Sequence, residues 1–294
     1  MEKILITGAA GFLGVNLAKK LLLRENILLY GVDDFSSSDV SNLYQLLKNN
    51  RYNFSEGDVL TSDLPYADVV FHFVGCGTFE KCYSNKYDYI YSIIKMLDKI
   101  LNYTVSTGAK LILVHDFVNI NKQNKKKKCY YNYLKLAENL VLEHKKTYKT
   151  NVKIARLPEL YGGNVSKFNL QLIEKIIFYV LSNKRISLEN NFVDYYTFID
   201  DAIDGLLLLM DKYIDDDIVD ISASVTASLS DFVQYILEYT NSKSKVEIKN
   251  YELIKPNYIP NTEVLKENFG FECSCDFKCN LAKTIDYFVA MYFS

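Results

Sequence analysis

The stretch Thr7-Gly8-Ala9-Ala10-Gly11-Phe12-Leu13-Gly14 decides the fold of this 294-residue chain. It follows the short apolar run 3–6, which is typical of a buried strand, and it opens a predicted helix. Gly8 permits a tight turn, Gly11 lets the backbone approach a pyrophosphate, and Gly14 lets the helix pack on the strand. Because a helix N-terminus offers free N–H groups to phosphate, the stretch predicts a dinucleotide site.

A second predicted strand, residues 27–32, ends at Asp33-Asp34. Asp33 lies 19 residues after Gly14. An acidic side chain at this spacing accepts hydrogen bonds from the adenosine ribose and repels a 2′-phosphate. The next residues, 35–38, contain no arginine that would bind such a phosphate. The sequence therefore predicts NAD rather than NADP as the cofactor.

Further strands alternate with helices along the first half of the chain. We expect one strand that ends at 57–59 and further strands over 67–75, 110–114 and 152–156. Helices are expected over 89–101 and 131–148. This alternation indicates an α/β protein with a Rossmann-type, doubly wound parallel sheet. Ligands of such sheets collect at the carboxyl ends of the strands. We therefore predict an NAD-binding domain over residues 1–162.

The pattern changes after residue 162. Helices are expected over 168–181, 200–210, 228–239 and 280–291, with short strands over 185–188 and 196–199. These elements predict a smaller C-terminal α/β substrate lobe over residues 163–294. The return of some of its segments to the Rossmann sheet stays open.

Composition excludes several classes of protein. The net charge of -2 gives no reason to expect nucleic acid as a partner. No apolar run approaches the roughly 18 residues of a membrane span, and no signal peptide pattern is present. The six scattered cysteines suggest a reducing, cytoplasmic location. Cys273, Cys275 and Cys279 do not form a paired C-x-x-C and have no histidine nearby, so we predict no metal site.

Tyr131 and Lys135 are the candidate catalytic pair. Four residues apart on a helix, they project from the same face. A lysine ammonium beside a phenol favours the phenolate, so we expect a lowered tyrosine pKa and a usable acid/base. The chain has 24 tyrosines, so this spacing alone is weak evidence. Its weight comes from the dinucleotide motif at the start of the chain.

With these residues laid out, the chain resembles the NAD-dependent epimerase/dehydratase family, the extended short-chain dehydrogenases that act on nucleotide sugars. The resemblance runs nearly from end to end. Its motifs are residues 7–14, Asp33, Gly57-Asp58-Val59, the stretch from Tyr131 to Glu138, Arg156-Leu157-Pro158 with Tyr161-Gly162, and Phe198-Ile199-Asp200-Asp201.

The resemblance implies a set of binding residues and partners. The partners are a nucleoside-diphosphate sugar and a second copy of the chain, since helices equivalent to 89–101 and 131–148 pair across a two-fold axis in this family. The substrate contacts would be His115, Gly75, Glu159 and Lys167. The cofactor contacts would be Gly8, Gly11, Phe12, Leu13, Gly14, Asp33, Asp34, Asp58, Val59, Phe73, Val74, Tyr131, Lys135 and Pro158.

The chain departs from the family pattern on the substrate side. Asp116 occupies the position of the family's catalytic Ser or Thr, unless a one-residue shift places His115 there. Asp194 stands where an arginine usually meets the phosphates of the sugar nucleotide. Phe117 and Val118 replace the Asp-Glu pair that a 4,6-dehydratase needs for proton transfer.

These residues predict oxidation at C4 of a nucleotide-activated hexose or heptose, with Tyr131 as base. Asp116 would accept a hydrogen bond from the substrate hydroxyl but, unless protonated, cannot donate one to a ketone. This favours a 4-dehydrogenase that releases its ketone. The alternatives are a 4-epimerase, then a 4,6-dehydratase, and a non-enzymatic NAD-binding sensor or scaffold. The nucleotide base, the sugar and the identity of C4 as the carbon attacked stay open.

Overall fold

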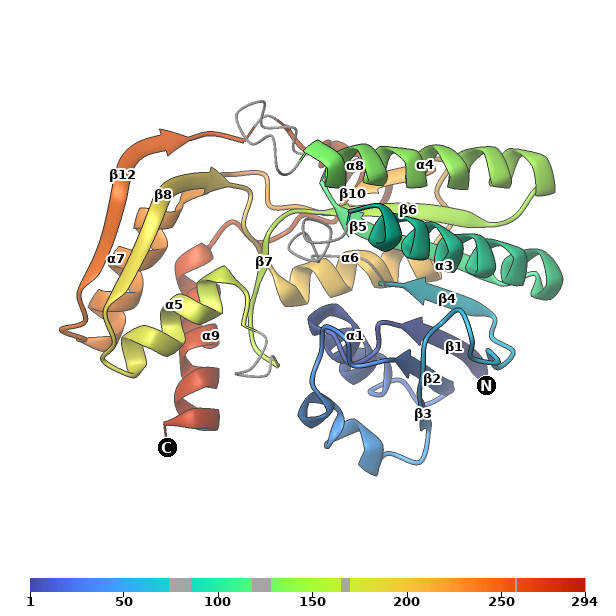
Figure 1. Cartoon of the computed structure of the whole chain (residues 1–294), viewed down its shortest axis with the longest axis horizontal. Helices are drawn as coiled ribbons and strands as arrows, with labels where there is room; N and C mark the ends of the chain where they lie inside the picture. Colours follow the sequence, from blue (N-terminus) through green and yellow to red (C-terminus); the bar gives the residue numbers. More distant parts are fainter. Residues whose placement is uncertain (74–85, 118–127, 165–169, 257, 294) are drawn as a thin grey trace.

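The computed structural model describes residues 1–73, 86–117, 128–164, 170–256 and 258–293. Within these residues a large parallel sheet with helices on both faces is joined to a smaller lobe (Figure 1). The sheet and its helices lie on the right of that view and the lobe lies on the left.

The large sheet has seven strands that all run parallel. Their order is β10-β6-β5-β4-β1-β2-β3, so the direction of winding reverses between β1 and β4. This order confirms the doubly wound sheet, and the reversal places a ligand crevice at the carboxyl ends of β1 and β4. The strands are β1 (Glu2–Thr7), β2 (Ile27–Asp33), β3 (Tyr52–Glu56), β4 (Val69–His72), β5 (Lys110–Asp116), β6 (Val152–Leu157) and β10 (Ile218–Asp220).

Two pairs of helices cover the two faces of this sheet. Helices α1 (Phe12–Leu21) and α6 (Ile199–Asp211) contact each other on one face, and α3 (Lys86–Thr107) and α4 (Lys128–Tyr148) contact each other on the other. Because side chains alternate along a strand, Ile4 and Ile6 pack in the core beneath α1, whereas Leu5 packs in the core beneath α3 and α4. Both faces are therefore buried, as the continuous apolar run of β1 requires.

The smaller lobe packs three helices against a short sheet. Strand β8 (Ile186–Asp194) lies between β12 (Val246–Ile254), which is parallel to it, and β11 (Ala227–Ser228), which is antiparallel. Helices α5 (Leu172–Leu181), α7 (Leu229–Thr240) and α9 (Phe277–Tyr292) contact one another. Ser228 begins α7 with a capping box that includes Asp231, which fixes the start of the helix.

Short elements complete the connections between the two parts. Strands β7 (Leu160–Tyr161) and β9 (Thr197–Phe198) pair in parallel where the chain passes between the sheet and the lobe. Helix α8 (Glu263–Phe269) contacts β10, and the 3-10 helices η1 (Val40–Leu43) and η2 (Leu46–Lys48) lie between β2 and β3.

Several described elements were not expected from the sequence: β7, β10, β11, β12, α8, η1 and η2. Strand β10 adds to the edge of the large sheet beside β6, so a segment from the second half of the chain does return to that sheet. The boundary at residue 162 itself stays a prediction.

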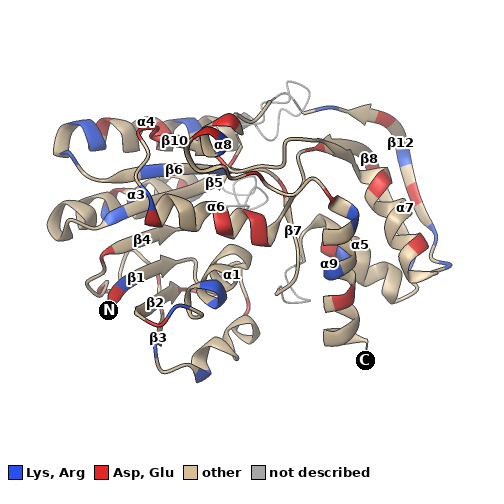
Figure 2. Cartoon of the chain, turned by 180° about the vertical axis from the view of Figure 1, so that it is seen from behind, with Lys and Arg blue, Asp and Glu red and all other residues tan. Residues whose placement is uncertain are grey.

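Basic and acidic residues are interspersed along β12 (Figure 2), consistent with a net charge of -2. Among the described helices, none combines the length and the apolarity that crossing a bilayer would need.

Candidate functional site

The turn between β1 and α1 has the geometry that the sequence predicted. Gly8 adopts a φ of +75°, a left-handed conformation that other residues rarely take. A Cβ on Gly14 would lie 2.4 Å from the Gly8 carbonyl oxygen, so the helix packs this closely only with glycine there. No side chain among the described residues caps the N-terminus of α1, and its first turn has no acidic residue. The turn therefore suits a phosphate group.

Asp33 joins the turn after β1 to the turn after β2. It is buried, and its Oδ2 accepts a hydrogen bond from the N–H of Ala10 at 2.9 Å. Its Oδ1 accepts from the N–H of Phe35 at 2.9 Å and from Oγ of Ser38 at 2.8 Å. Each carboxylate oxygen can accept two hydrogen bonds, so Oδ2 retains capacity for one ribose hydroxyl. These residues fit NAD, because the carboxylate is already oriented and would repel an added phosphate.

The other predicted cofactor residues line the same edge of the sheet. Phe73 follows β4, and its N–H donates to the carbonyl oxygen of Thr7 at 3.1 Å. Asp58 accepts at Oδ1 from the N–H of Leu60 at 2.8 Å, which shapes the turn after β3. The remaining described members are partly or fully buried apart from the exposed Asp34; they are Phe12, Leu13, Val59 and Pro158. Val74 lies outside the described residues.

The candidate catalytic helix is α4. It places Tyr131 in a buried position, with its ring 5.9 Å from that of Tyr130, while Lys135 is exposed. The sequence predicted a lowered pKa for Tyr131, and this prediction is wrong for the protein without its cofactor. Burial raises the pKa of Tyr131 above its usual value, and the negative charges of Asp116, Asp194 and Glu159 raise it further. Three carboxylates near the phenol outweigh the lysine on the same helix, because that lysine extends into solvent.

Asp116 ends β5 and faces α4. Its Oδ2 accepts a hydrogen bond from the hydroxyl of Tyr130 at 2.8 Å. Its negative charge also contributes to the raised pKa of Tyr131, whose ring contacts that of Tyr130. Asp116, Tyr130 and Tyr131 therefore form one cluster at the carboxyl end of β5. The sequence predicted Asp116 and Tyr131 but missed Tyr130, whose only signal was its place in a run of tyrosines.

His115 lies behind this cluster rather than in it. The side chain is 4% exposed; Nδ1 lies 2.7 Å from the carbonyl oxygen of Asp116, and Nε2 lies 3.0 Å from Oε1 of Glu138. Both ring nitrogens therefore face groups of the protein. This geometry favours a supporting role over the predicted contact with the substrate.

Glu138, which contacts His115, is in turn bound by Arg156 on the neighbouring strand β6. Arg156 donates from Nε to Oε1 of Glu138 at 2.6 Å and from Nη2 to Oε2 at 2.9 Å, a bidentate pair. Burial would raise the pKa of Glu138, but the hydrogen bonds and charges of His115 and Arg156 bring it to about 2. On the other side of Arg156, the hydroxyl of Tyr258 accepts from Nη1 at 3.2 Å and itself donates to Asp220.

The predicted substrate residues are only partly described. Glu159 is exposed after β6, and its carbonyl oxygen accepts from the N–H of Thr197 at 3.0 Å, so it lies where the sheet meets the lobe. Asp194 ends β8, and both side chains contribute to the raised pKa of Tyr131. Gly75 and Lys167 lie outside the described residues.

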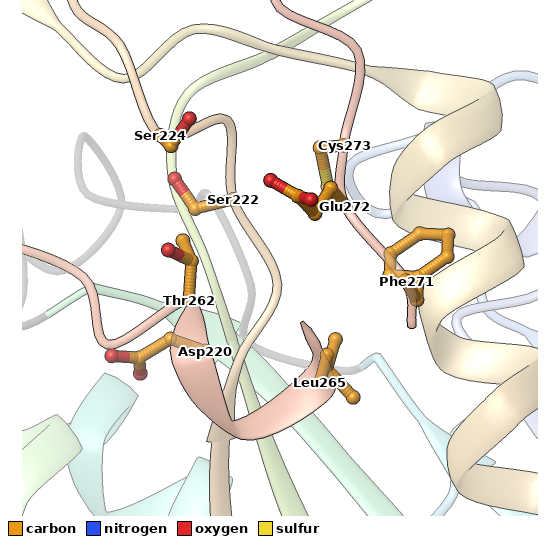
Figure 3. A pocket seen from close by; sticks show the side chains of 8 residues that line it. All are labelled: Asp220, Ser222, Ser224, Thr262, Leu265, Phe271, Glu272 and Cys273. Carbon is orange, nitrogen blue, oxygen red and sulfur yellow. The ribbon is translucent and has the colours of Figure 1, made fainter. Parts of the chain in front are cut away.

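A small pocket lies at the carboxyl end of β10 (Figure 3). Two of its polar side chains are engaged: Oδ2 of Asp220 accepts from the N–H of Asn261 at 2.8 Å, and the Ser222 hydroxyl donates to the carbonyl oxygen of Ala223 at 2.8 Å. Oδ1 of Asp220 has no hydrogen-bond partner among the described residues. Glu272 lies 3.3 Å from the Lys266 ammonium. We therefore assign this pocket a role in packing rather than in binding. Its lining residues are Asp220, Ser222, Ser224, Thr262, Leu265, Phe271, Glu272 and Cys273.

Within the described part of the chain, no group of three or more His, Cys, Asp or Glu side chains could hold a metal ion.

Comparison with known proteins decides the family. A family model described as NAD dependent epimerase/dehydratase family matches residues 4–221. The chain belongs to this family. Membership confirms the predicted resemblance, and it confirms NAD as the cofactor and an enzyme as the class of protein at the level of the family.

The chain is similar to proteins whose names give different reactions. The UDP-glucuronic acid decarboxylase 1 of Danio rerio is 22% identical over 98% of this chain and 72% of its own length. The UDP-glucose 4-epimerase of Thermotoga maritima, solved with UDP-glucose, has a TM-score of 0.85 at 19% identity, covering 98% of this chain and 99% of its own. The UDP-glucuronic acid 4-epimerase of Bacillus cereus, solved with UDP-glucuronic acid and NAD, has a TM-score of 0.82 at 19% identity, with 99% and 100% covered.

Proposed function

We propose that this protein oxidises C4 of a nucleotide-activated sugar, with Tyr131 as the base, and releases the ketone as a 4-dehydrogenase. The observation that carries the proposal is the Asp116 carboxylate, which accepts a hydrogen bond from Tyr130 and whose charge raises the pKa of Tyr131. When bound, NAD supplies the hydride acceptor for this chemistry. The turn after β1 and Asp33 would hold it.

Tyr131 would take the proton of the C4 hydroxyl. Its buried ring is held on α4, so the phenol oxygen has a defined position. Because burial and three carboxylates raise its pKa, the phenolate needs positive charge beside it. Lys135, one turn along the same helix face, is the residue of the chain that would supply this charge and hydrogen-bond the ribose of the cofactor.

Asp116 would orient the substrate. One carboxylate oxygen is committed to Tyr130, and the other can accept a hydrogen bond from the sugar hydroxyl. Once the hydroxyl has become a ketone, an ionised carboxylate has no proton to donate to it. The site therefore holds the alcohol better than the ketone, and this difference favours release of the product.

The side chain next to Asp116 disfavours a dehydratase. Phe117 is buried, and its ring lies 4.8 Å from that of Tyr258. An aromatic ring in this position cannot transfer the protons that elimination of water requires. Val118, the second expected position, lies outside the described residues.

A 4-epimerase is the second candidate, because it shares the same oxidation step and then returns the hydride. The two similar structures named above are 4-epimerases by their descriptions, and both descriptions name a UDP-sugar. The substrate we propose is accordingly a nucleoside-diphosphate sugar. We further propose a homodimer, which the exposed Tyr91 on α3 and Leu136 on α4 support, and we propose a cytoplasmic location.

The test uses purified protein with UDP-, GDP- and dTDP-sugars, and it follows NADH by absorbance and the sugar by NMR. We expect NADH and a 4-keto sugar in the wild type, and a loss of roughly 10²–10⁴-fold in Tyr131→Phe. Tyr133→Phe, on the same helix and equally buried, is the matched control and should retain most of the activity. No NADH with any sugar would contradict the proposal and favour an NAD-binding scaffold.

A further inference from the structure

We propose that His115 is a positioning residue that holds Asp116 at a fixed place relative to the catalytic helix α4. Two contacts join the end of β5 to that helix. Tyr130 donates to the Asp116 side chain at 2.8 Å, and Glu138 lies 3.0 Å from the His115 ring. Tyr130 and Glu138 enclose Tyr131 and Lys135 along the helix, so the two contacts tie both ends of the catalytic segment to β5.

The contact between His115 and the backbone is directional. Nδ1 lies 2.7 Å from the carbonyl oxygen of Asp116, and a carbonyl can only accept, so the imidazole donates through Nδ1. This bond fixes the peptide that follows Asp116. The N–H of the same peptide, which belongs to Phe117, donates to the carbonyl oxygen of Leu157 at 2.9 Å. The peptide between Asp116 and Phe117 is therefore held at both its C=O and its N–H.

The orientation of the His115 ring is set from its other side. Nε2 lies 3.0 Å from Oε1 of Glu138 without the geometry of a hydrogen bond, and Arg156 holds that carboxylate through two hydrogen bonds. Because Glu138 is itself immobilised, it gives the ring a fixed reference on α4. Because His115 contacts both Glu138 on α4 and the carbonyl of Asp116, it keeps Asp116 at a fixed position relative to the helix.

Two variants separate positioning from simple packing. Asn carries its amide nitrogen at the same branch as Nδ1, so His115→Asn can still donate to the carbonyl of Asp116. His115→Leu fills similar space and cannot donate. His144→Leu, elsewhere on α4, is the matched control for removal of a histidine.

The first readout is hydrogen exchange of the peptide that covers Leu113 to Phe117, and it needs no activity. We expect roughly five-fold faster exchange in His115→Leu, from the loss of one hydrogen bond, and near wild-type exchange in His115→Asn and in the control. Unchanged exchange in the leucine variant, or equal acceleration in both variants of His115, would overturn the inference.

The second readout rests on the proposed function. In His115→Leu, kcat should fall roughly 10–100-fold, because Asp116 is displaced, while the KM for the sugar and the affinity for NADH change little. His115→Asn keeps the bond to the Asp116 carbonyl but lacks the contact with Glu138, so it should recover part of this loss. A loss carried by KM alone, or no recovery by asparagine, would contradict positioning. If the wild type turns over no nucleotide sugar, the proposed function fails, and the exchange measurement alone decides the role of His115.

Discussion

Glu174, in the first turn of α5, should make the protein less stable as the pH rises. Its side chain is 0% exposed. Oε1 accepts a hydrogen bond from the N–H of Gly162 at 2.8 Å, whereas Oε2 has no hydrogen-bond partner among the described residues. Burial raises the pKa of this carboxyl from 4.5 to about 8. The folded protein therefore binds a proton here that the unfolded chain has already released at neutral pH.

The sign and size follow from linkage. Between pH 4.5 and 8 the folded state binds more protons at Glu174 than the unfolded state does, so stability falls as the pH rises. From pH 4.5 to pH 7 the loss accumulates over about 2.5 pH units at about 1.36 kcal/mol each, or about 3 kcal/mol. The stabilisation is fully present only below the unfolded pKa, and its loss is complete above about pH 8.

Glu174→Gln isolates this effect, because glutamine keeps the acceptor for Gly162 and cannot ionise. Urea unfolding of both proteins at pH 4, 5.5 and 7 gives the free energies of unfolding. The variant should match the wild type within about 1 kcal/mol at pH 4 and exceed it by about 3 kcal/mol at pH 7. Glu252→Gln, on the exposed strand β12, controls for the loss of one negative charge. A difference that does not change with pH would refute the reasoning.

Three further predictions concern the cofactor, the base and the assembly. In fluorescence titrations the wild type should bind NADH more tightly than NADPH, and Asp33→Ala should reduce this difference in affinity. Tighter binding of NADPH by the wild type would contradict the assignment of NAD as the cofactor. Below the raised pKa of Tyr131, kcat should rise with pH by up to about tenfold per pH unit, because only the phenolate accepts a proton. A kcat that does not change with pH would exclude Tyr131 as the base. Sedimentation should give the mass of two chains at micromolar concentration, and a mass near one chain would contradict the homodimer.

The turn after β1 could be predicted because its causes are local. The left-handed Gly8 and the close packing at Gly14 depend on backbone within a few residues, so the spacing of the glycines is sufficient. Strand β12 had only a short local signal. Apolar and polar residues alternate from Val246 to Lys249, but the register with β8 shifts between Asn250 and Leu253, and most side chains of the strand are exposed. Its pairing with β8 extends the strand beyond that short alternation.

The chemistry of the candidate site was less accessible from sequence. The lowered pKa expected for Tyr131 rested on Lys135 alone. The carboxylates of Asp194 and Glu159 act on Tyr131 only because the lobe packs against the sheet. No sequence pattern predicts how these two parts of the chain pack. The contact of His115 with Glu138 likewise joins residues on different elements, and its existence depends on the direction in which a buried ring points.

The most direct test of C4 oxidation by Tyr131 follows a label rather than a rate. A nucleotide sugar carrying deuterium at C4 is mixed with the protein and NAD, and the dinucleotide is analysed by mass spectrometry. The account predicts one deuterium in the NADH formed by the wild type, a 4-keto sugar lacking it, and neither product from Tyr131→Phe within the same time. Deuterium that returns to C4 as the epimer accumulates would identify a 4-epimerase. Deuterium that stays on the original sugar while NADH forms would show that another carbon is oxidised, and would contradict the account.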